Sequence, residues 1–445
     1  MPNHCASLTK GLPWILLLTL FGAACNAPAP SGATAPNSPS ANAALSSTAT
    51  SAPTDTPTVA PSPTPGPAGM TVVGPVETVF DWSADRCTRL DIPDLPARAF
   101  RDADGNVQLI SSHIETRRMI GPTLDEVTRD CTVRMASDHN PDPALFDDNQ
   151  WIAAPYTEDG TTIYALVHQE YHGWEHSTDC ASVDHFQCWY NSITLALSTN
   201  GGQSYDEAAT PPGHLVAALP DRYQAETGPN GVFEPSNIVK KDGAYYAFVR
   251  IDATSSDEQR ICLMRTEDLS DPASWRFWDG DGFNVRMGDP YTMPDSALGG
   301  MPCAGISPDT LGIMDQSVTF NTYLNRYVMV GITATHIDGR EVWGVLYSTS
   351  SDLIHWDQRQ LLFEAKLPWT WQPGDDPYLL YATLLDPNSP SQDFETSGKT
   401  GYVYFTRFNR PQAEPLDRDL VRVPVEFFQT PAEAQAATVP FVIQP

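Results

Sequence analysis

Five segments of the chain alternate apolar and polar residues in the manner of a β-strand, and each follows a turn or loop signal. They lie at residues 102–113, 158–170, 240–251, 323–334 and 397–408. Similar β-units repeated along a chain are typical of radial all-β architecture, in which each unit builds one sheet around a common axis. The pattern therefore predicts an all-β protein with a five-bladed β-propeller.

A second pattern follows three of these segments: an apolar strand, a polar turn and then an aromatic residue. It occupies residues 193–205, 261–275 and 345–356. Asp and Asn close such turns by accepting hydrogen bonds from backbone N–H groups, and the aromatic ring covers the end of the sheet. We interpret these turns as structural and assign them no chemistry.

The N-terminus has the features of an export signal. An apolar run at residues 12–21 is too short to span a bilayer of about 30 Å, and small residues follow it before Cys25. The segment Phe21-Gly22-Ala23-Ala24-Cys25 resembles a bacterial lipobox. The sequence thus predicts a lipoprotein-type signal peptide at 1–25 and lipidation of Cys25, which would leave the protein exported and lipid-anchored at the bacterial cell surface. An ordinary signal peptide with an incidental Cys is the alternative.

Composition separates a linker from the folded domain. Residues 26–69 are mainly Ala, Ser, Thr and Pro, with no Lys or Arg and one acid, Asp55. Such a segment has too few large apolar side chains to form a core. We predict a disordered linker at 26–75 and the propeller at 76–445.

Six cysteines remain when Cys5 and Cys25 are set aside, and an even number in an exported protein predicts three disulfides. Fifteen pairings of six cysteines are possible. Proximity within a blade favours Cys87–Cys131, Cys180–Cys188 and Cys262–Cys303. A zinc site of Cys180, Cys188, His176 and His185 is the alternative, although the chain has no Cys-x-x-Cys pair.

Charge limits the choice of partner. The chain has 26 Lys and Arg against 55 Asp and Glu, a net charge of −29. This field repels nucleic acid and anionic membrane surfaces and disfavours polyanionic substrates. A neutral oligosaccharide or polysaccharide fits best, with membrane contact only through the lipid anchor, and we expect a monomer. The 16 Tyr, 11 Trp and 17 Phe agree, because aromatic faces stack on sugar rings.

Carboxylates occur just before each predicted blade, where side chains converge on the axis of a propeller. They are Asp94, the group Asp142, Asp147 and Asp148, then Glu234, Asp315, and the pair Asp375 and Asp376. Glycoside hydrolysis requires two carboxyl groups, one protonated to assist the leaving group and one ionised. Several buried carboxylates around one axis acquire different pKa values, which is what acid/base catalysis needs.

Residues 231–249, GVFEPSNIVKKDGAYYAFV, resemble the general-acid segment of five-bladed glycosidases of the glycoside hydrolase family 43 type. Residues 142–148, DPALFDD, resemble the segment whose first Asp orients the substrate in that family. The resemblance, which covers roughly residues 85–410, implies Glu234 as the acid, Asp142 as the orienting Asp and Asp94 as the base. In this chain the three acids would fall on blades one, two and three, rather than one, three and four.

Further substrate contacts are expected around these acids. The segment from Trp151 to Tyr156 resembles the family's second-blade entrance, with Tyr156 in place of an Asp. His168, His172 and His176 recur every fourth residue, which on a helix would form a metal site, but Gly173 and the preceding strand favour a loop. We predict no metal ligands and no required cofactor, although the resemblance allows for a calcium ion on the propeller axis. The predicted substrate-binding residues are Arg98, Trp151, Tyr156, His172, His176, Asp315 and Tyr381.

Taken with the export signal, these features predict a surface-tethered glycoside hydrolase that acts on a neutral glycan. Two alternatives use the same fold: a non-catalytic carbohydrate-binding propeller, and a protein-interaction propeller of the cell envelope. Convergence of Asp94, Asp142 and Glu234 on one concave pocket would favour hydrolysis.

Overall fold

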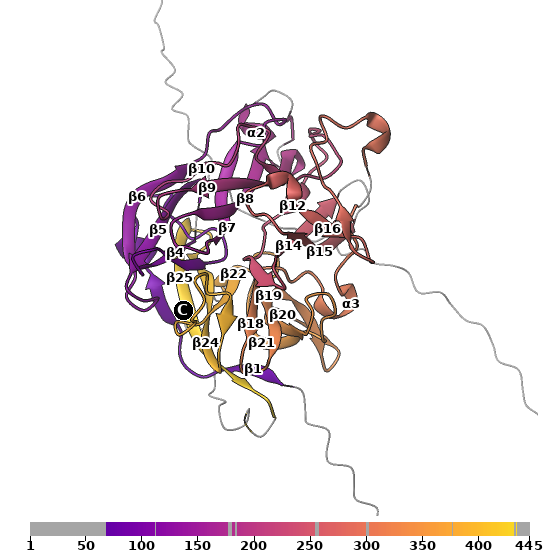
Figure 1. Cartoon of the computed structure of the whole chain (residues 1–445). Helices are drawn as coiled ribbons and strands as arrows, with labels where there is room; N and C mark the ends of the chain where they lie inside the picture. Colours follow the sequence, from indigo (N-terminus) through magenta and orange to yellow (C-terminus); the bar gives the residue numbers. More distant parts are fainter. Residues whose placement is uncertain are drawn as a thin grey trace, which may run out of the picture.

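The computed structural model describes residues 68–111, 113–176, 180–182, 185–253, 258–299, 302–375, 377–430 and 433. The predicted signal peptide, Cys25 and most of the predicted linker lie outside these residues. Within them the protein is all-β, as the alternating pattern predicts. Figure 1 shows the sheets arranged around a common centre, with the chain running round the molecule from indigo to yellow.

The chain builds its sheets as successive antiparallel meanders. A four-stranded sheet, β3-β4-β5-β6, comes first. An eleven-stranded sheet follows, in which β12 pairs in parallel with β9 and antiparallel with β14. The strands of these two sheets are β3 Arg98–Arg101, β4 Val107–Ile110, β5 Glu115–Gly121, β6 Thr128–Ala136, β7 Asn149–Tyr156, β8 Ile163–His172, β9 Trp189–Ser198, β10 Asp206–Glu207, β11 Leu215–Ala217, β12 Asn230–Phe233, β13 Val239–Lys241, β14 Ala244–Ala253, β15 Glu258–Thr266, β16 Arg276–Trp278 and β17 Phe283–Val285.

Two five-stranded sheets complete the fold. One runs β21-β20-β19-β18-β23, and the other has β25 paired with β24, β1 and β2. Their strands are β18 Ser317–Asn321, β19 Arg326–Ile337, β20 Arg340–Ser350, β21 Gln360–Glu364, β22 Tyr378–Leu385, β23 Thr396–Ser397, β24 Thr400–Arg410, β25 Glu414–Phe428, β1 Gly69–Val72 and β2 Glu77–Phe80.

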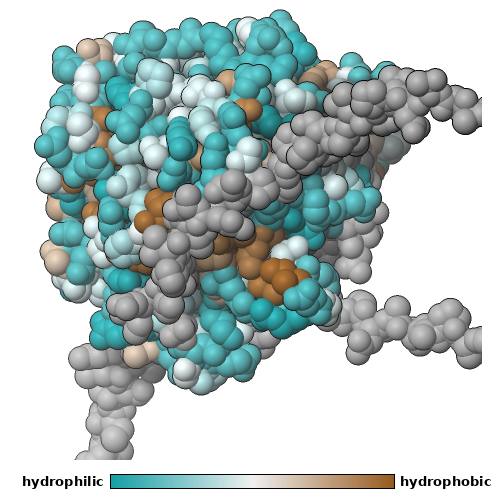
Figure 2. All heavy atoms as spheres, turned by 90° about the horizontal axis from the view of Figure 1, so that it is seen from below, coloured by the Kyte–Doolittle hydropathy of each residue, from teal (hydrophilic) through white to brown (hydrophobic). Residues whose placement is uncertain are grey.

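The helices are single turns. They are α1 Trp82–Asp85, α2 Gly173–His176 and α3 Pro308–Leu311, with 3-10 turns η1 His185–Cys188, η2 Pro272–Ser274 and η3 Asp295–Ala297. In the part of the chain that the structure describes, none of the helices has the length and apolar character needed to cross a bilayer. The face in Figure 2 is mostly hydrophilic, with small hydrophobic patches.

The first strand begins earlier than composition suggested. β1 lies inside the range 26–75 expected to be linker, and it pairs with β25 in the register Gly69↔Phe428 to Val72↔Val425. Met70 and Val72 are buried in the core of this last sheet. Two apolar side chains on one face of a short strand are enough to bring it into the fold.

Each of the five repeats supplies the second strand of a meander. β4, β8, β14, β19 and β24 lie in the repeated segments and pair with β3, β7, β12, β18 and β22, respectively. The turn motifs behave as expected: Asp352 Oδ1 accepts the backbone N–H groups of Ile354 and His355 at 2.9 and 2.8 Å, and Trp356 is buried.

Arg98, at the start of β3, joins the first strands of several meanders. Its Nε donates to the carbonyl of Ala153 at 3.0 Å, and its Nη2 donates to the carbonyl of Gln316 at 2.6 Å. Its Nη1 donates to the hydroxyl of Thr383 at 2.8 Å. The residue is 3% exposed. Arg98 is therefore a buried residue that links β3, through hydrogen bonds, to β7, to β22 and to the residue before β18.

The three predicted disulfides are confirmed. Cys87 pairs with Cys131, Cys180 with Cys188, and Cys262 with Cys303. The Cys180–Cys188 bond also shows that the alternative zinc site was wrong, because disulfide sulfurs are not thiolate ligands.

Candidate active site

A cavity of about 400 Å³ lies where the beginnings of the meanders meet. Its walls come from the segment before β3, from β7 and β8, from the end of β12, and from β22 and β25. The polar lining residues are Arg89, Asp94, His113, Asn149, His168, Glu170, His172, Glu175, Glu234, Tyr381 and Arg418; the apolar and aromatic ones are Leu90, Ile92, Leu95, Ile114, Trp151 and Leu416.

Asp94 is the carboxylate on the first-sheet side of the cavity. Its Oδ1 accepts hydrogen bonds from the Arg418 guanidinium and, at 3.3 Å, from the Tyr381 hydroxyl. Its Oδ2 lies 3.1 Å from His113 Nδ1. Burial alone would raise the pKa of Asp94, but Arg418 and His113 outweigh burial and hold the pKa below its ordinary value. Asp94 is therefore ionised at neutral pH.

Glu234 faces the same cavity from the end of β12, and its pKa moves the other way. Burial raises the pKa of Glu234, and the positive charge of Arg250 offsets only part of this rise. The backbone N–H of Glu234 donates to His168 Nδ1 at 3.3 Å, which places the His168 proton on Nε2. One cavity thus contains two carboxyl groups with opposite pKa shifts.

Glu170 lies between two histidines on one face of β8. Its carboxylate is 2.9 Å from His168 Nε2 and 2.7 Å from His172 Nε2. Burial opposes the charge, but the two hydrogen bonds outweigh it and lower the pKa of Glu170 to about 2. Burial likewise opposes the charge of His172, but Glu170 and Glu175 outweigh it and raise the pKa of His172 to about 9. The result is a second ionised carboxylate, paired with an imidazolium, in the wall of the cavity.

Asp315 and Arg98 lie in the protein interior close to Glu234 and do not line the cavity. Burial raises the pKa of Asp315 to about 7, with Glu234 adding to the rise and Arg250 opposing it. Burial lowers the pKa of Arg98 to about 9, although the negative charges of Glu234 and Asp315 oppose the change. These two groups act on the site through their charges.

The structure brings together five of the predicted residues: Asp94, Trp151, His172, Glu234 and Tyr381 line the cavity. Asp142 does not. It lies in an exposed turn, where its Oδ1 accepts the backbone N–H of Ala144 at 3.0 Å. Because Asp142 does not line the cavity, the three acids do not converge as a set.

Tyr156 and His176 also lie outside the cavity. Tyr156 is at the far end of β7 and packs edge-on against Tyr245, with 5.3 Å between ring centroids. His176 Nε2 lies 2.8 Å from Asp148 Oδ1.

Seven polar residues of the cavity were not among the predicted site residues: Arg89, His113, Asn149, His168, Glu170, Glu175 and Arg418. His168 and Glu170 had a usable signal, because residues 168, 170 and 172 share one face of a strand. Their spacing suggested a helix or loop, whereas β8 continues to His172 before the single turn of α2. Arg418 had no signal, since it reaches Asp94 from 324 residues away.

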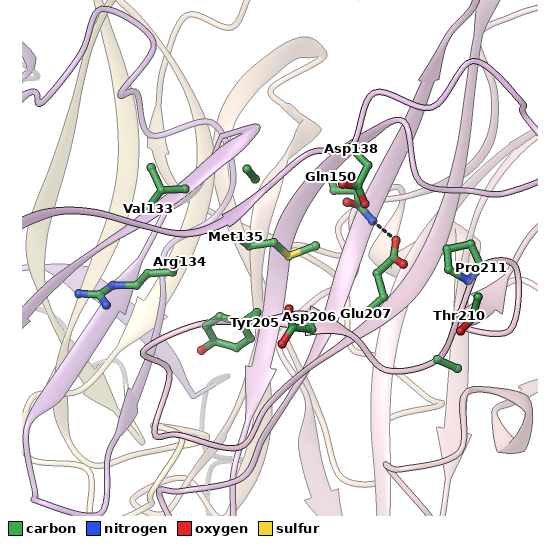
Figure 3. Close-up of a pocket in the computed structure, with 12 residues that line it drawn as sticks. Val133, Arg134, Met135, Asp138, Gln150, Tyr205, Asp206, Glu207, Thr210 and Pro211 are labelled. Carbon is green, nitrogen blue, oxygen red and sulfur yellow. Dashed lines mark hydrogen bonds between the residues drawn. The ribbon is translucent and has the colours of Figure 1, made fainter.

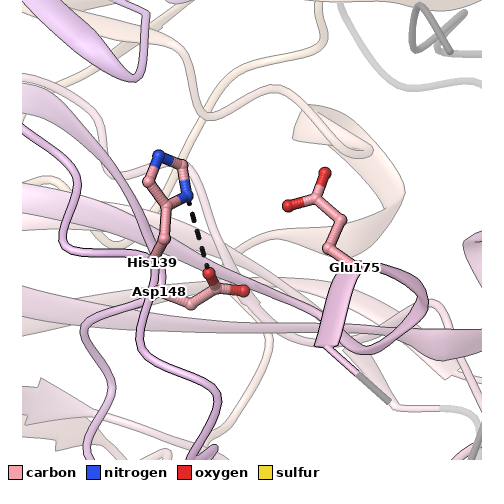
Figure 4. Close-up of side chains that lie close together, drawn as sticks. All are labelled: His139, Asp148 and Glu175. Atoms are coloured by element: carbon pink, nitrogen blue, oxygen red, sulfur yellow. Dashed lines mark ion pairs between the residues drawn. The ribbon is translucent and has the colours of Figure 1, made fainter. Parts of the chain in front are cut away.

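One group of side chains at the edge of the cavity has the residue types of a metal site. The ligand atoms of His139, Asp148 and Glu175 lie within 4.8 Å of one another (Figure 4). The polar atoms of two of them already have partners: Asp148 Oδ2 accepts the backbone N–H of His172 at 2.8 Å, and Glu175 Oε1 lies 3.3 Å from His172 Nδ1. The arrangement therefore already serves to position His172.

No protein-family model matches the chain, and no curated protein matches its sequence. Solved structures with some similarity include the catalytic domain of a GH62 α-L-arabinofuranosidase from Coprinopsis cinerea, at 10% identity and a TM-score of 0.43, which covers 80% of this chain and 97% of that one. An endo-arabinase from Bacteroides thetaiotaomicron has 10% identity and a TM-score of 0.41, with 79% and 98% covered.

A third structure, provisionally assigned as a glycosidase from Bacteroides thetaiotaomicron, has 16% identity and a TM-score of 0.31. The alignment covers 60% of this chain and 64% of that one. At such low identities and TM-scores, the function has to rest on the geometry of the site itself.

Proposed function

We propose that the protein is a glycoside hydrolase that acts on a neutral glycan, with Glu234 as the general acid and Asp94 as the base. The observation that carries this proposal is the pair of opposite pKa shifts in one cavity. An acid that must give a proton to a leaving group needs a raised pKa, and a base must be ionised at the same pH. Glu234 meets the first requirement and Asp94 meets the second.

The walls of the cavity suit a sugar. Trp151 and the apolar residues Leu90, Leu95 and Leu416 offer surfaces for the apolar faces of sugar rings. Arg89 offers hydrogen-bond donors for hydroxyl groups. A neutral substrate also avoids the repulsion that a net charge of −29 would impose on a polyanion.

A screen of the full chain against aryl-glycosides and neutral polysaccharides tests the proposal. In Glu234→Gln, we expect activity on substrates with poor leaving groups to fall by about 100-fold or more, because Gln cannot donate a proton. Activated aryl-glycosides should lose much less in the bond-breaking step. Asp94→Asn should lose activity on both kinds of substrate.

The matched control is Asp142→Asn, which removes the third predicted acid from its exposed turn and should keep most of the activity. Full activity in both Glu234→Gln and Asp94→Asn would rule out these catalytic roles. Equal losses on both substrate classes in a folded Glu234→Gln protein would instead assign Glu234 to substrate positioning.

One observation favours a second candidate, a non-catalytic carbohydrate-binding site. Both oxygens of Asp94 have partners inside the protein, namely Arg418, Tyr381 and His113. A carboxylate engaged in this way is well suited to hold the cavity in shape. Calorimetric binding of a neutral oligosaccharide without any hydrolysis would select this function.

We also propose that the fold is a five-bladed propeller on a lipid-anchored, monomeric protein. The eleven-stranded sheet counts as two blades, because β12 and β9 are joined only through Asn230↔Tyr190 and Gly231↔Asn191. Three disulfides support export, since such bonds persist in oxidising compartments. Mass spectrometry of the mature N-terminus would test the anchor at Cys25.

A further inference from the structure

A second cavity, of about 600 Å³, opens beside β6 and β10 and shares no lining residue with the candidate active site. Figure 3 shows Asp138, Gln150 and Glu207 with their polar groups close together at one side of it. Three segments meet there: the residues after β6, the start of β7, and β10. The cavity therefore lies between the first sheet and the sheet that follows it.

Three carboxylates crowd this side of the cavity. Asp138, Asp147 and Glu207 each offer an oxygen, and these oxygens lie within 4.8 Å of one another. Burial raises the pKa of Glu207 to about 7, with Gln150 opposing and Asp147 adding to the rise. Burial also raises the pKa of Asp147, partly offset by Asn140 and increased by Asp138. The three carboxyl groups thus lie close enough together to repel one another when they are ionised.

The basic side chains nearby already have other partners. Arg134 lines the cavity, but its Nη1 donates to the Gln203 carbonyl at 3.0 Å and its Nη2 pairs with Asp130. His214 Nε2 lies 3.5 Å from Glu207 Oε1, but the same nitrogen lies closer, at 3.2 Å, to the carbonyl of Phe146.

A buried amide beside the three carboxyl groups has an acceptor atom that no protein donor satisfies. Gln150 is 1% exposed, and its Nε2 donates to Glu207 Oε1 at 3.2 Å, so the amide lies at the cluster. Its Oε1 is buried and has no hydrogen-bond partner. Asp147, 5% exposed, also has one buried oxygen without a partner. Buried acceptors are almost always satisfied, by a donor or by a cation.

We propose that Asp138, Asp147, Gln150 and Glu207 bind a calcium ion. All four donors are oxygens, and calcium takes six to eight oxygen ligands at about 2.3–2.6 Å. Two ligands on opposite sides of one such ion lie about 5 Å apart, which agrees with oxygens that fall within 4.8 Å. Water entering from the cavity completes the shell. Zinc would prefer nitrogen or sulfur, and magnesium would demand a smaller octahedral site.

This site lies beside β6 and β10, whereas the calcium ion that the sequence resemblance allows for would lie on the propeller axis. The ion would fasten the segment at 138–147 to β7 and β10. The next residue, Asp148, accepts the backbone N–H of His172 at 2.8 Å, so the same segment supports a wall of the candidate active site. A calcium ion here would stabilise the junction of two sheets and the histidine wall together.

Isothermal titration of the full chain with calcium chloride, after dialysis against EDTA, tests the proposal. We expect one calcium ion to bind, and an excess of calcium to raise the melting temperature by several degrees. Asp147→Asn and Gln150→Leu should weaken calcium binding at least tenfold. Gln150→Leu is the sharper variant, since it changes no charge.

Asp242→Asn is the control, because it removes one charge from an exposed turn that does not line this cavity and should bind calcium like the wild type. Magnesium should bind at least tenfold more weakly than calcium. The proposal fails if millimolar calcium does not bind, if magnesium binds equally well, or if calcium binding is unchanged in both variants.

A second readout covers the case in which a variant does not fold. Terbium is a luminescent substitute for calcium, and Tyr205 in the wall of the cavity would transfer excitation to it. Tyr205→Phe should dim terbium emission while leaving calcium affinity within a factor of two or so of the wild type. Undiminished terbium emission in Tyr205→Phe would contradict a site in this cavity.

Discussion

Asp315 shows how one buried carboxyl couples folding to pH. Its Oδ2 is buried without a hydrogen-bond partner, and burial raises its pKa to about 7. An unfolded Asp titrates near pH 4, so between about pH 4 and pH 7 the folded state holds a proton that the unfolded state has lost. The contribution of Asp315 to stability therefore falls as pH rises through this window.

Asp315→Asn has no proton to lose and should remove this dependence. Relative to the wild type, its free energy of unfolding should rise by up to about 4 kcal/mol between about pH 4 and pH 8. Urea denaturation at several pH values measures the difference. Parallel stability curves for the two proteins would show that Asp315 is ionised throughout.

Arg98 is the residue whose loss should destabilise the fold most directly. Its guanidinium donates to Ala153, Gln316 and Thr383, and removing it leaves these buried acceptors without their donor. Arg98→Met should lower the free energy of unfolding by about 3–5 kcal/mol. Arg340→Met is the control: Arg340 makes two hydrogen bonds to Glu364 on the exposed surface, and its loss should destabilise the fold far less. Equal losses of unfolding free energy in the two variants would contradict the role of Arg98 in linking the sheets.

At the scale of single residues, sequence reasoning found the acids that stand directly before or after short buried strands, Asp94 and Glu234. It could not find Arg418, because the partner of Asp94 depends on the register of β25 against β24, which no local pattern specifies. Asp142 satisfied the local pattern equally well, yet its turn faces solvent. Whether a residue before a strand faces the cavity depends on the path of the loop, which only the assembled sheets determine.

At the scale of elements, the disulfides close loops of different length and should differ in their contribution to stability. Cys262–Cys303 spans 41 residues and Cys180–Cys188 spans 8. The entropy of loop closure predicts about 4 kcal/mol for the first and about 2.5 kcal/mol for the second. Double Cys→Ala variants of each pair, compared by chemical denaturation, should show this order. A greater loss from the short loop would mean that contacts near the histidines of β8, rather than chain entropy, decide its value.

Strands that follow a turn signal were predicted well, even where nearly all their residues are buried, as in β4 and β8, and strands without such a signal were not. The second strands of the meanders, such as β19, carry visible alternation or aromatic residues after a turn. All eight residues of β7 are buried, so apolar and polar residues do not alternate along this strand and the sequence pattern does not reveal it. β1 was assigned to the linker because a strand of four residues is too short to be recognised next to a Pro-rich segment.

At the scale of the whole molecule, the excess of negative charge should make stability depend on ionic strength. With a net charge of −29, repulsion among surface carboxylates opposes the compact state, and salt screens it as the Debye length falls from about 30 Å at 0.01 M to about 10 Å at 0.1 M. The melting temperature should therefore rise over this range. Choline chloride should act like sodium chloride at equal ionic strength. A falling melting temperature in both salts would mean that surface ion pairs outweigh the repulsion.

The pairing of β1 with β25 makes the order of the sheets cyclic. Gly69 lies opposite Phe428, so the two ends of the described domain emerge side by side from one sheet. A short peptide joining them would close the chain into a ring, and new ends could then be opened in an exposed turn such as the one at Gly105. The position at which the gene begins is in this sense arbitrary, and any module fused to either end would hold the domain from the same side.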